Sequence, residues 1–125
     1  MLGNTKIVGF IPTRNPKRAR EFFEGVLGLR FVSADPFATV FDANGIMLRV
    51  ANVPEYTPYP FTIFGWEVTE IEKIVGVLAE KGVDFQRYPW MGELPLPVWT
   101  APGGVAKVAW FKDPDGNILS LSQHA

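Results

Sequence analysis

The chain of 125 residues contains an internal repeat, and this repeat constrains the fold more than any other feature. The sequence GLRF at 28–31 matches GVDF at 82–85, and the turn sequence DANG at 42–45 matches DPDG at 113–116. Around these matches, the apolar periodicity predicts the order strand, helix, strand, strand, strand in each half. We therefore expect an α+β fold built from two βαβββ modules.

The two modules are expected over 5–53 and 61–123 of a single domain, 1–125. A linker with three prolines, 54–60, separates them. The second module alone has a Pro- and Trp-rich insertion at 88–104, for which we expect a long loop with a functional role. The strands are predicted at 6–13, 29–34, 39–42, 46–51, 61–68, 83–87, 105–111 and 117–122.

Each module contains one helix whose start is predicted from capping residues. Asn15 is a favourable N-cap, and Pro16 follows at the first helical position. Thr69 and Glu72 have the spacing of a capping box, in which the two residues satisfy each other's backbone amides. Both helices place apolar residues on one face. These faces consist of Ala19, Phe22, Phe23 and Val26, and of Ile71, Ile74, Val75 and Leu78.

The charge and composition of the chain argue against some classes of binding partner. Twelve basic and thirteen acidic residues give a net charge of −1, which provides no long-range attraction for nucleic acid or an anionic membrane. The basic cluster over 14–20 is interpreted as a solvated helix face. No cysteine is present, and no apolar run is long enough for a membrane span. We expect a cytoplasmic protein that binds neither nucleic acid nor membranes.

Two motifs resemble those of a known superfamily. RAREFFEGVLGL at 18–29 resembles the RAxxFYxxxLG stretch of the vicinal oxygen chelate superfamily, and FKDPDGN at 111–117 matches its F-x-DPDGN hairpin. That superfamily includes glyoxalase I, extradiol dioxygenases, fosfomycin-modifying enzymes and bleomycin-resistance proteins. The resemblance implies a curved mixed sheet with a concave cavity that is lined by alternating strand residues.

The enzymes of that superfamily hold a divalent metal on four His, Glu or Gln side chains, and the resemblance assigns these positions here. The positions hold Val8, Arg49, Ile63 (or Thr62 if the register slips by one) and Ser120. Valine and isoleucine cannot coordinate a metal, arginine repels one, and serine alone is a poor ligand. The single histidine, His124, is penultimate and expected at a frayed surface. We therefore expect no cofactor and no metal-dependent enzyme.

Loss of the metal does not remove the cavity. Strand alternation places further residues on the faces that carry the four positions. These residues are Phe10, Met47, Phe61, Glu67, Ile118 and Ser122. An apolar surface with a few polar groups is typical of a small-molecule site, and a core filled by the same side chains is the alternative.

Arg49 is the most informative single candidate, because a guanidinium on an apolar face needs an anion or water. Glu67 is one internal partner, and a carboxylate or phosphate of a bound ligand is the other. Trp90 and Trp99 also have two interpretations, as stacking planes for a flat ligand or as contacts in a homodimer. The superfamily contains members whose ligand sites lie between subunits, so both interpretations can hold.

Three hypotheses for function follow. The first is a metal-independent protein that binds and sequesters an aromatic or amphipathic compound, with Arg49, Met47, Phe10, Ile63, Glu67, Ser120, Trp90 and Trp99 as ligand-binding residues. The second is a metal-free lyase or isomerase acting on a carboxylate-bearing substrate, with Glu67 as a weak catalytic candidate. The third is a structural or regulatory domain whose own side chains close the cavity.

Overall fold

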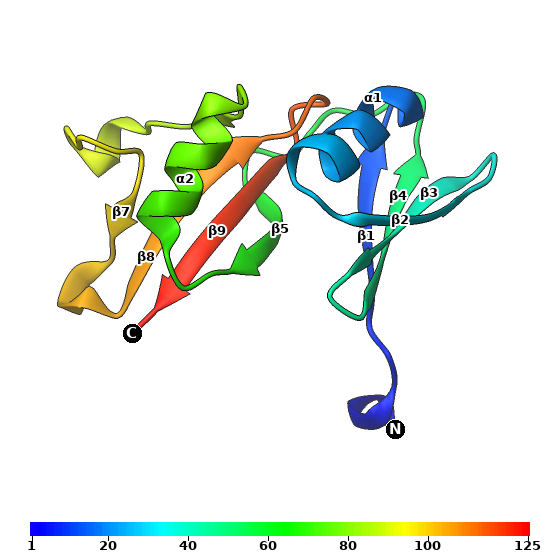
Figure 1. Cartoon of the computed structure of the whole chain (residues 1–125), viewed down its shortest axis with the longest axis horizontal. Coiled ribbons are helices and arrows are strands. Elements are labelled where there is room, and N and C mark those ends of the chain that lie inside the picture. Colours follow the sequence, from blue (N-terminus) through cyan, green and yellow to red (C-terminus); the bar gives the residue numbers. More distant parts are fainter. The chain divides into compact units, whose positions relative to one another are not determined.

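The computed structural model describes all residues from Met1 to Ala125, and the chain forms two compact units. Unit 1 comprises Met1–Thr57 and unit 2 comprises Pro58–Ala125. Each unit contains one main helix, α1 with its continuation η2 or α2, and one mixed sheet (Figure 1). The predicted α+β class and the two βαβββ modules are therefore confirmed, while the assignment of both modules to a single domain stays a prediction.

Unit 1 is a four-stranded sheet in the order β1-β4-β3-β2, with β1 parallel to β4 and the other pairs antiparallel. Its helix α1 continues directly into a π-helical segment, η2, and a short 3₁₀ turn, η1, precedes β1. The elements are η1 Leu2–Asn4, β1 Val8–Thr13, α1 Pro16–Arg20, η2 Glu21–Val26, β2 Arg30–Ala34, β3 Ala38–Ala43 and β4 Ile46–Asn52.

Unit 2 repeats this topology in the order β5-β9-β8-β6, with an additional short strand, β7, that also pairs with β8. The strand pair β5–β9 is parallel, as β1–β4 is in unit 1. The elements are β5 Thr62–Glu67, α2 Ile71–Glu80, β6 Asp84–Phe85, η3 Pro89–Met91, β7 Trp99–Thr100, η4 Pro102–Gly104, β8 Ala106–Lys112 and β9 Ile118–His124.

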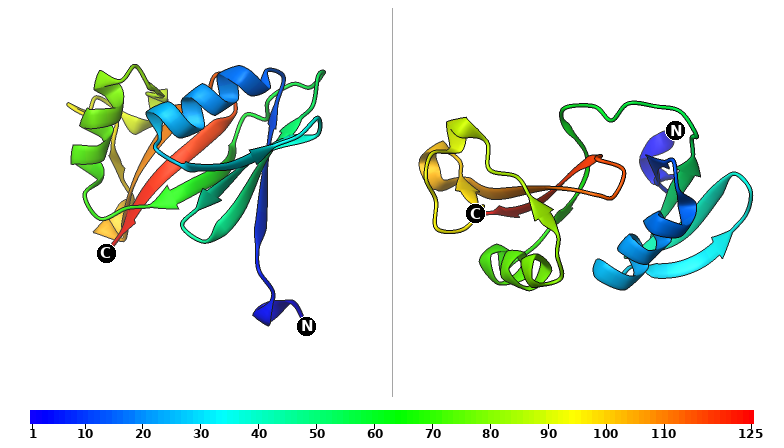
Figure 2. Two further views of the ribbon diagram at one scale, coloured as in Figure 1. Left: turned by 45° about the vertical axis from the view of Figure 1, so that its right-hand side comes forward. Right: turned by 90° about the horizontal axis from the view of Figure 1, so that it is seen from above.

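In each unit the main helix, α1 or α2, covers one face of the sheet, which we call the helix face (Figure 2). The opposite face is called the open face. In unit 1 the core on the helix face includes Ile11, Phe23 and Phe41, all fully buried. In unit 2 the corresponding core includes Val75 of α2 and Phe111 of β8, both fully buried. Burial of one such side chain stabilises the folded state by about 2 kcal/mol.

The first helix begins as predicted and the second does not. The Asn15 side chain accepts a hydrogen bond from the Arg18 backbone amide at 3.2 Å, and Pro16 is the first helical residue. The prediction of a capping box formed by Thr69 and Glu72 is wrong, because α2 begins at Ile71 and its N-cap residue, Glu70, makes no side-chain capping hydrogen bond. Instead, the Ile71 backbone amide donates to the Gln123 side chain of β9 at 2.9 Å.

Two further predictions need correction. The strand predicted at 83–87 is only two residues long, Asp84–Phe85, although the Gln86 amide still donates to the Trp110 carbonyl of β8 at 2.8 Å. The insertion at 88–104 is not a plain loop, since it contains η3, η4 and the strand β7, which pairs with β8. The first hairpin has the predicted turn, with positive φ angles of 53° at Asn44 and 89° at Gly45. None of the helices combines the length and apolar character that a membrane span requires.

Candidate functional site

Four aromatic side chains gather on the open face of unit 2. Trp110 lies on β8, Trp99 lies opposite Val108 on the neighbouring β7, and Tyr88 and Trp90 come from the insertion. We call the group Tyr88, Trp90, Trp99 and Trp110 the aromatic wall. Its members reach the same surface because β7 pairs with β8 and η3 carries Trp90 next to them.

The rings of the aromatic wall contact one another with favourable geometries. Tyr88 and Trp90 stack nearly parallel, with centroids 5.8 Å apart and an interplanar angle of 7°. Trp90 meets Trp99 edge to face at 5.2 Å and Trp110 edge to face at 5.5 Å. Despite these contacts, Trp90 remains 59% exposed, so a large part of its ring is available to another molecule.

Two adjoining cavities lie beside the aromatic wall, with volumes of about 390 and 440 Å³. They share Pro60, Tyr88 and Ile118, and we call them together the aromatic groove. The first cavity is lined by Pro60, Phe61, Thr62, Tyr88, Trp90, Trp110 and Ile118. The second is lined by Pro58, Tyr59, Pro60, Gln86, Tyr88, Lys112, Gly116 and Ile118. Each volume falls within the range of pockets that hold small organic molecules.

Tyr88 lines both cavities and is the one residue with a polar side chain that they share. Partial burial raises the pKa of the Tyr88 phenol above its ordinary value of 10.0. The hydroxyl therefore stays protonated at neutral pH and can donate a hydrogen bond. Tyr59 of the second cavity and Phe61 of the first stack with ring centroids 5.1 Å apart and an interplanar angle of 9°.

The insertion that supplies Trp90 is anchored at two points. The Arg87 guanidinium donates to the carbonyl of Leu94 at 2.6 Å and to that of Pro95 at 3.4 Å. Met91 is buried, and its sulfur accepts from the Tyr88 backbone amide at 3.3 Å. These contacts hold the segment between Trp90 and Trp99 without a long regular element.

The remaining candidates of unit 2 lie nearby but outside the groove. The β5–β9 ladder is irregular at Ile63 and places Thr62 opposite Ile118. Thr62, and not Ile63, lines the groove. Ser120 lies opposite Gly65, and a Cβ atom on Gly65 would come within 2.5 Å of the Ser120 hydroxyl oxygen. The small residue at 65 therefore allows β5 to approach Ser120 closely.

Glu67 pairs with His124, which was expected from the sequence to lie at a frayed surface. The His124 Nδ1 atom lies 2.7 Å from Glu67 Oε1, and His124 is the last residue of β9, so the expectation of fraying is wrong. Both side chains are largely exposed, and neither lines the aromatic groove. A pair between Arg49 and Glu67 remains an untested prediction.

The open face of unit 1 carries the other candidates. The ladders place Val8 opposite Met47, and Phe10 opposite Arg49, so that alternation puts these four residues on one face. Phe10 is 60% exposed and Met47 is 45% exposed. Arg49 is half-buried, and within unit 1 no carboxylate lies within 4 Å of it.

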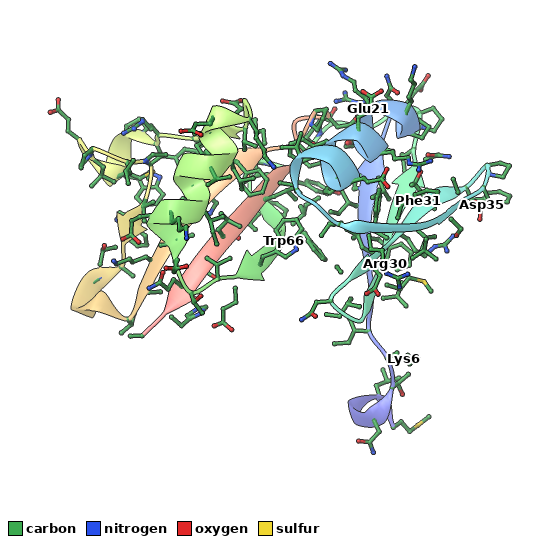
Figure 3. All side chains as sticks on the ribbon, viewed as in Figure 1. Lys6, Glu21, Arg30, Phe31, Asp35 and Trp66 are labelled. Atoms are coloured by element: carbon green, nitrogen blue, oxygen red, sulfur yellow. The ribbon has the colours of Figure 1, made fainter.

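The charge of Arg49 acts on Asp35. The pKa of Asp35 is lowered chiefly by hydrogen bonds from the Phe37 and Ala38 backbone amides, with a smaller contribution from the Arg49 charge. A separate cavity of about 340 Å³ lies on this unit and includes Val8 and Met47. Lys6 and Arg30 also line it (Figure 3), and Arg30 pairs with Asp42 at 2.7 Å.

The residues do not fit the metal centre that the resemblance implies. Of the four corresponding positions, Val8 and Ile63 have no donor atom, Arg49 carries a positive charge, and Ser120 offers one hydroxyl. Nowhere do three His, Cys, Asp or Glu side chains come together in an arrangement able to hold a metal ion.

Of the two predicted tryptophans, Trp90 lines the first cavity, whereas Trp99 contacts Trp90 but lines neither cavity. Gln86 and Lys112, which line the second cavity, were not among the candidates from the sequence. A signal for Lys112 exists in the sequence, because strand alternation places it on the same face as Trp110. Gln86 gives no such signal, since its position depends on a backbone hydrogen bond from its amide to the Trp110 carbonyl at 2.8 Å.

Comparison with solved structures shows the same fold in other proteins. A glyoxalase family protein from Bacillus anthracis matches with a TM-score of 0.77 and 12% identity, over 98% of this chain and 96% of the other. The fosfomycin resistance protein FosX from Listeria monocytogenes matches with a TM-score of 0.76 and 11% identity, over 100% and 95%. TnmS3, an antibiotic binding protein from Streptomyces sp. CB03234, matches with a TM-score of 0.74 and 17% identity, over 100% and 99%.

At these identities the structural similarities show the fold alone. No curated protein sequence matches the chain significantly. The sequence profile of one family, however, matches residues 6–121, which is most of the chain. This match spans both modules and both motifs, and the fold agrees with it. The chain therefore belongs to the Glyoxalase/Bleomycin resistance protein/Dioxygenase superfamily.

Proposed function

We propose that this protein binds a flat aromatic or amphipathic organic molecule without a metal and sequesters it in the aromatic groove of unit 2. The observation that carries the proposal is the exposed Trp90 ring, which is held in an ordered aromatic wall beside two open cavities. A solvated tryptophan in such a place has its largest favourable interaction with a planar apolar partner.

Two features support binding rather than a closed core. The groove is open to solvent, whereas a structural domain would fill it with its own side chains. The wall is also preorganised, because the Tyr88–Trp90 stack and the Arg87 contacts fix the rings before a ligand arrives. Trp90 and Trp99 are therefore the first ligand-binding residues to test.

The other candidates remain part of the proposal in a secondary role. Phe10, Met47 and Arg49 form an exposed surface on unit 1 that offers apolar contacts and one cation. Among the structurally similar proteins, TnmS3 is described as an antibiotic binding protein, which supports small-molecule sequestration as a use of this fold. We further propose a cytoplasmic homodimer that needs no cofactor and binds neither nucleic acid nor membranes.

A metal-free lyase or isomerase is less well supported. Its candidate acid or base, Glu67, lies outside the groove and is exposed, with His124 as its neighbour. A general base must reach the proton it removes from a bound substrate, and no cavity lined by Glu67 brings a substrate there.

The test is a titration of the purified protein with planar aromatic acids, alcohols, amines and antibiotics, followed by tryptophan fluorescence and thermal unfolding. A compound present at about 100 times its Kd should add about 2.7 kcal/mol to the free energy of unfolding. We expect aromatic compounds, and not divalent metals, to quench the fluorescence and raise Tm.

Trp90→Ala should weaken the binding of such a compound by about tenfold, because it removes the exposed stacking surface. Phe37→Ala is the matched control, since Phe37 is 75% exposed in unit 1 and lines none of the cavities described above. Equal losses in the two variants, or stabilisation by metals alone, would contradict the proposal.

A further inference from the structure

Lys112 is the single charged residue that lines the aromatic groove. Neither cavity contains an acidic residue, an arginine or a second lysine among its lining side chains. Lys112 reaches the groove because it follows Trp110 by two positions on β8, opposite Ile118 of β9. The groove therefore combines an aromatic surface with one positive charge.

The ammonium group of Lys112 has no partner within unit 2. Asp84 lies opposite Lys112 in the β6–β8 ladder, yet no carboxylate oxygen comes within 4 Å of the ammonium nitrogen. Lys107 of the same strand behaves differently, because it lies near α2 and pairs with Glu72 at 2.7 Å. Unit 2 thus pairs one lysine of β8 and leaves the other facing the groove.

We propose that the groove selects planar aromatic molecules that carry an anionic group, with the Lys112 ammonium binding the anion and the aromatic wall binding the ring. The proposal rests on the proposed function and names the ligand class for the same groove. The Lys112 side chain is exposed, so its ammonium attracts an anion as a surface charge does, and stacking of the ring on the aromatic wall adds to this attraction. The two cavities share Pro60, Tyr88 and Ile118, so one molecule can occupy both.

The polar groups around Lys112 are consistent with an anionic ligand. The Tyr88 phenol stays protonated and can donate to a carboxylate beside the ammonium. Gln86 Nε2 donates to the Asp84 carbonyl at 3.0 Å, so this side chain is already held at the edge of the cavity. A cationic ligand would meet the Lys112 charge with no carboxylate in the lining to compensate for it.

The experiment compares three probes with the same ring, namely 2-naphthoate, 2-naphthalenemethanol and 2-naphthylmethylammonium, by tryptophan fluorescence titration. Wild-type protein should bind the naphthoate about tenfold more tightly than the alcohol, and the ammonium compound most weakly. The advantage of the naphthoate should shrink as salt is raised to about 0.5 M, because ions screen the charge.

Lys112→Met should remove this advantage by weakening naphthoate binding about tenfold while leaving the alcohol unchanged, and Lys112→Arg should retain it. Lys73→Met, on the exposed surface of α2, is the matched control for loss of one positive charge and should bind all three probes as the wild type does. Circular dichroism of each variant verifies the fold.

The outcomes separate this inference from the proposed function. If wild-type protein binds the naphthoate and the alcohol equally, the ligand class is wrong and the aromatic groove remains a binding site. If the ammonium compound binds most tightly, the assignment of Lys112 is overturned directly. If none of the three probes binds, both the inference and the proposed function fail.

Discussion

The two units share a topology and differ on their open faces. In unit 1 the connection between β2 and β3 is only three residues, and the open face displays Phe10, Met47 and Arg49. In unit 2 the corresponding connection, between β6 and β8, is an insertion that contributes β7 and most of the aromatic wall. The helix face of the sheet thus supports the scaffold in both units, and the insertion adds Tyr88, Trp90 and Trp99 to the open face of unit 2.

A second difference lies in the turns that match in the repeat. Asp42 accepts hydrogen bonds from the Arg30 guanidinium and from the Gly45 backbone amide, and these bonds, the first most strongly, lower its pKa. Asp113 is 5% exposed, and burial raises its pKa despite its hydrogen bonds. The same residue type at the same place in the repeat is therefore held by a solvated turn in unit 1 and by a buried one in unit 2.

The largest expected effect separates these two turns. Asp113→Ala leaves the backbone amides of Asp115 and Asn117 without the acceptor they now share, Asp113 Oδ1, at 3.0 and 2.9 Å. Unsatisfied buried donors of this kind destabilise a fold, so urea unfolding should show a loss of about 3 kcal/mol. Asp42→Ala should give a clearly smaller loss, because water can replace its carboxylate; equal losses would show that the turns do not differ in this way.

The next effect concerns the insertion. Arg87→Ala removes the guanidinium that holds the Leu94 and Pro95 carbonyls, and the exposure of this contact limits the expected loss of stability to about 1 kcal/mol. Binding of an aromatic ligand should weaken about threefold because the wall is less preorganised. Hydrogen exchange should become faster over 90–99 and stay unchanged in unit 1.

Arg18→Ala is the matched control, since Arg18 is exposed on α1 and its side chain makes no hydrogen bond. If Arg87→Ala binds ligand as well as wild-type protein does, the insertion holds its rings without this contact.

The fold was predictable where the signals are local. Asn15 and Pro16 mark the start of α1, and Asn44 with Gly45 marks a hairpin, because each acts through backbone angles or hydrogen bonds a few residues away. The start of α2 was mispredicted for the opposite reason. Its cap, Gln123, lies 52 residues further along the chain, and no local pattern contains that information.

The candidate site shows the same division. Tryptophans in an insertion were noticeable from composition, so Trp90 and Trp99 became candidates, and the structure brings their rings into contact. Lys112 was missed because it stands inside a turn motif that already has a structural explanation. The contact of Glu67 with His124 was missed because strand pairing over 57 residues brings them together.

The two helix starts provide a smaller test. Gln123→Ala should lower the free energy of unfolding by about 1 kcal/mol, since it removes the acceptor of the Ile71 amide, and Asn15→Ala should cost about the same in unit 1. Thr69→Ala should be neutral, because Thr69 makes no capping contact. Chemical denaturation of the three variants checks this order, and a loss in Thr69→Ala comparable to that in Gln123→Ala would restore the capping box.

The smallest expected effect is on the pH dependence of stability, to which Asp113 and Asp42 should contribute with opposite signs. Because the pKa of Asp113 is raised above its ordinary value of 3.8, the folded state binds its proton more tightly than the unfolded state does. The stability of wild-type protein relative to Asp113→Asn should therefore fall as pH rises from 3.8 through the raised pKa.

The pKa of Asp42 is lowered instead, so its carboxylate stabilises the folded state above pH 3.8. The stability of wild-type protein relative to Asp42→Asn should therefore decrease as pH falls below 3.8. Urea unfolding of both pairs between about pH 3 and pH 7 measures the two slopes. Slopes of the same sign would mean that burial does not dominate at Asp113, and the contrast between a solvated and a buried turn would no longer hold.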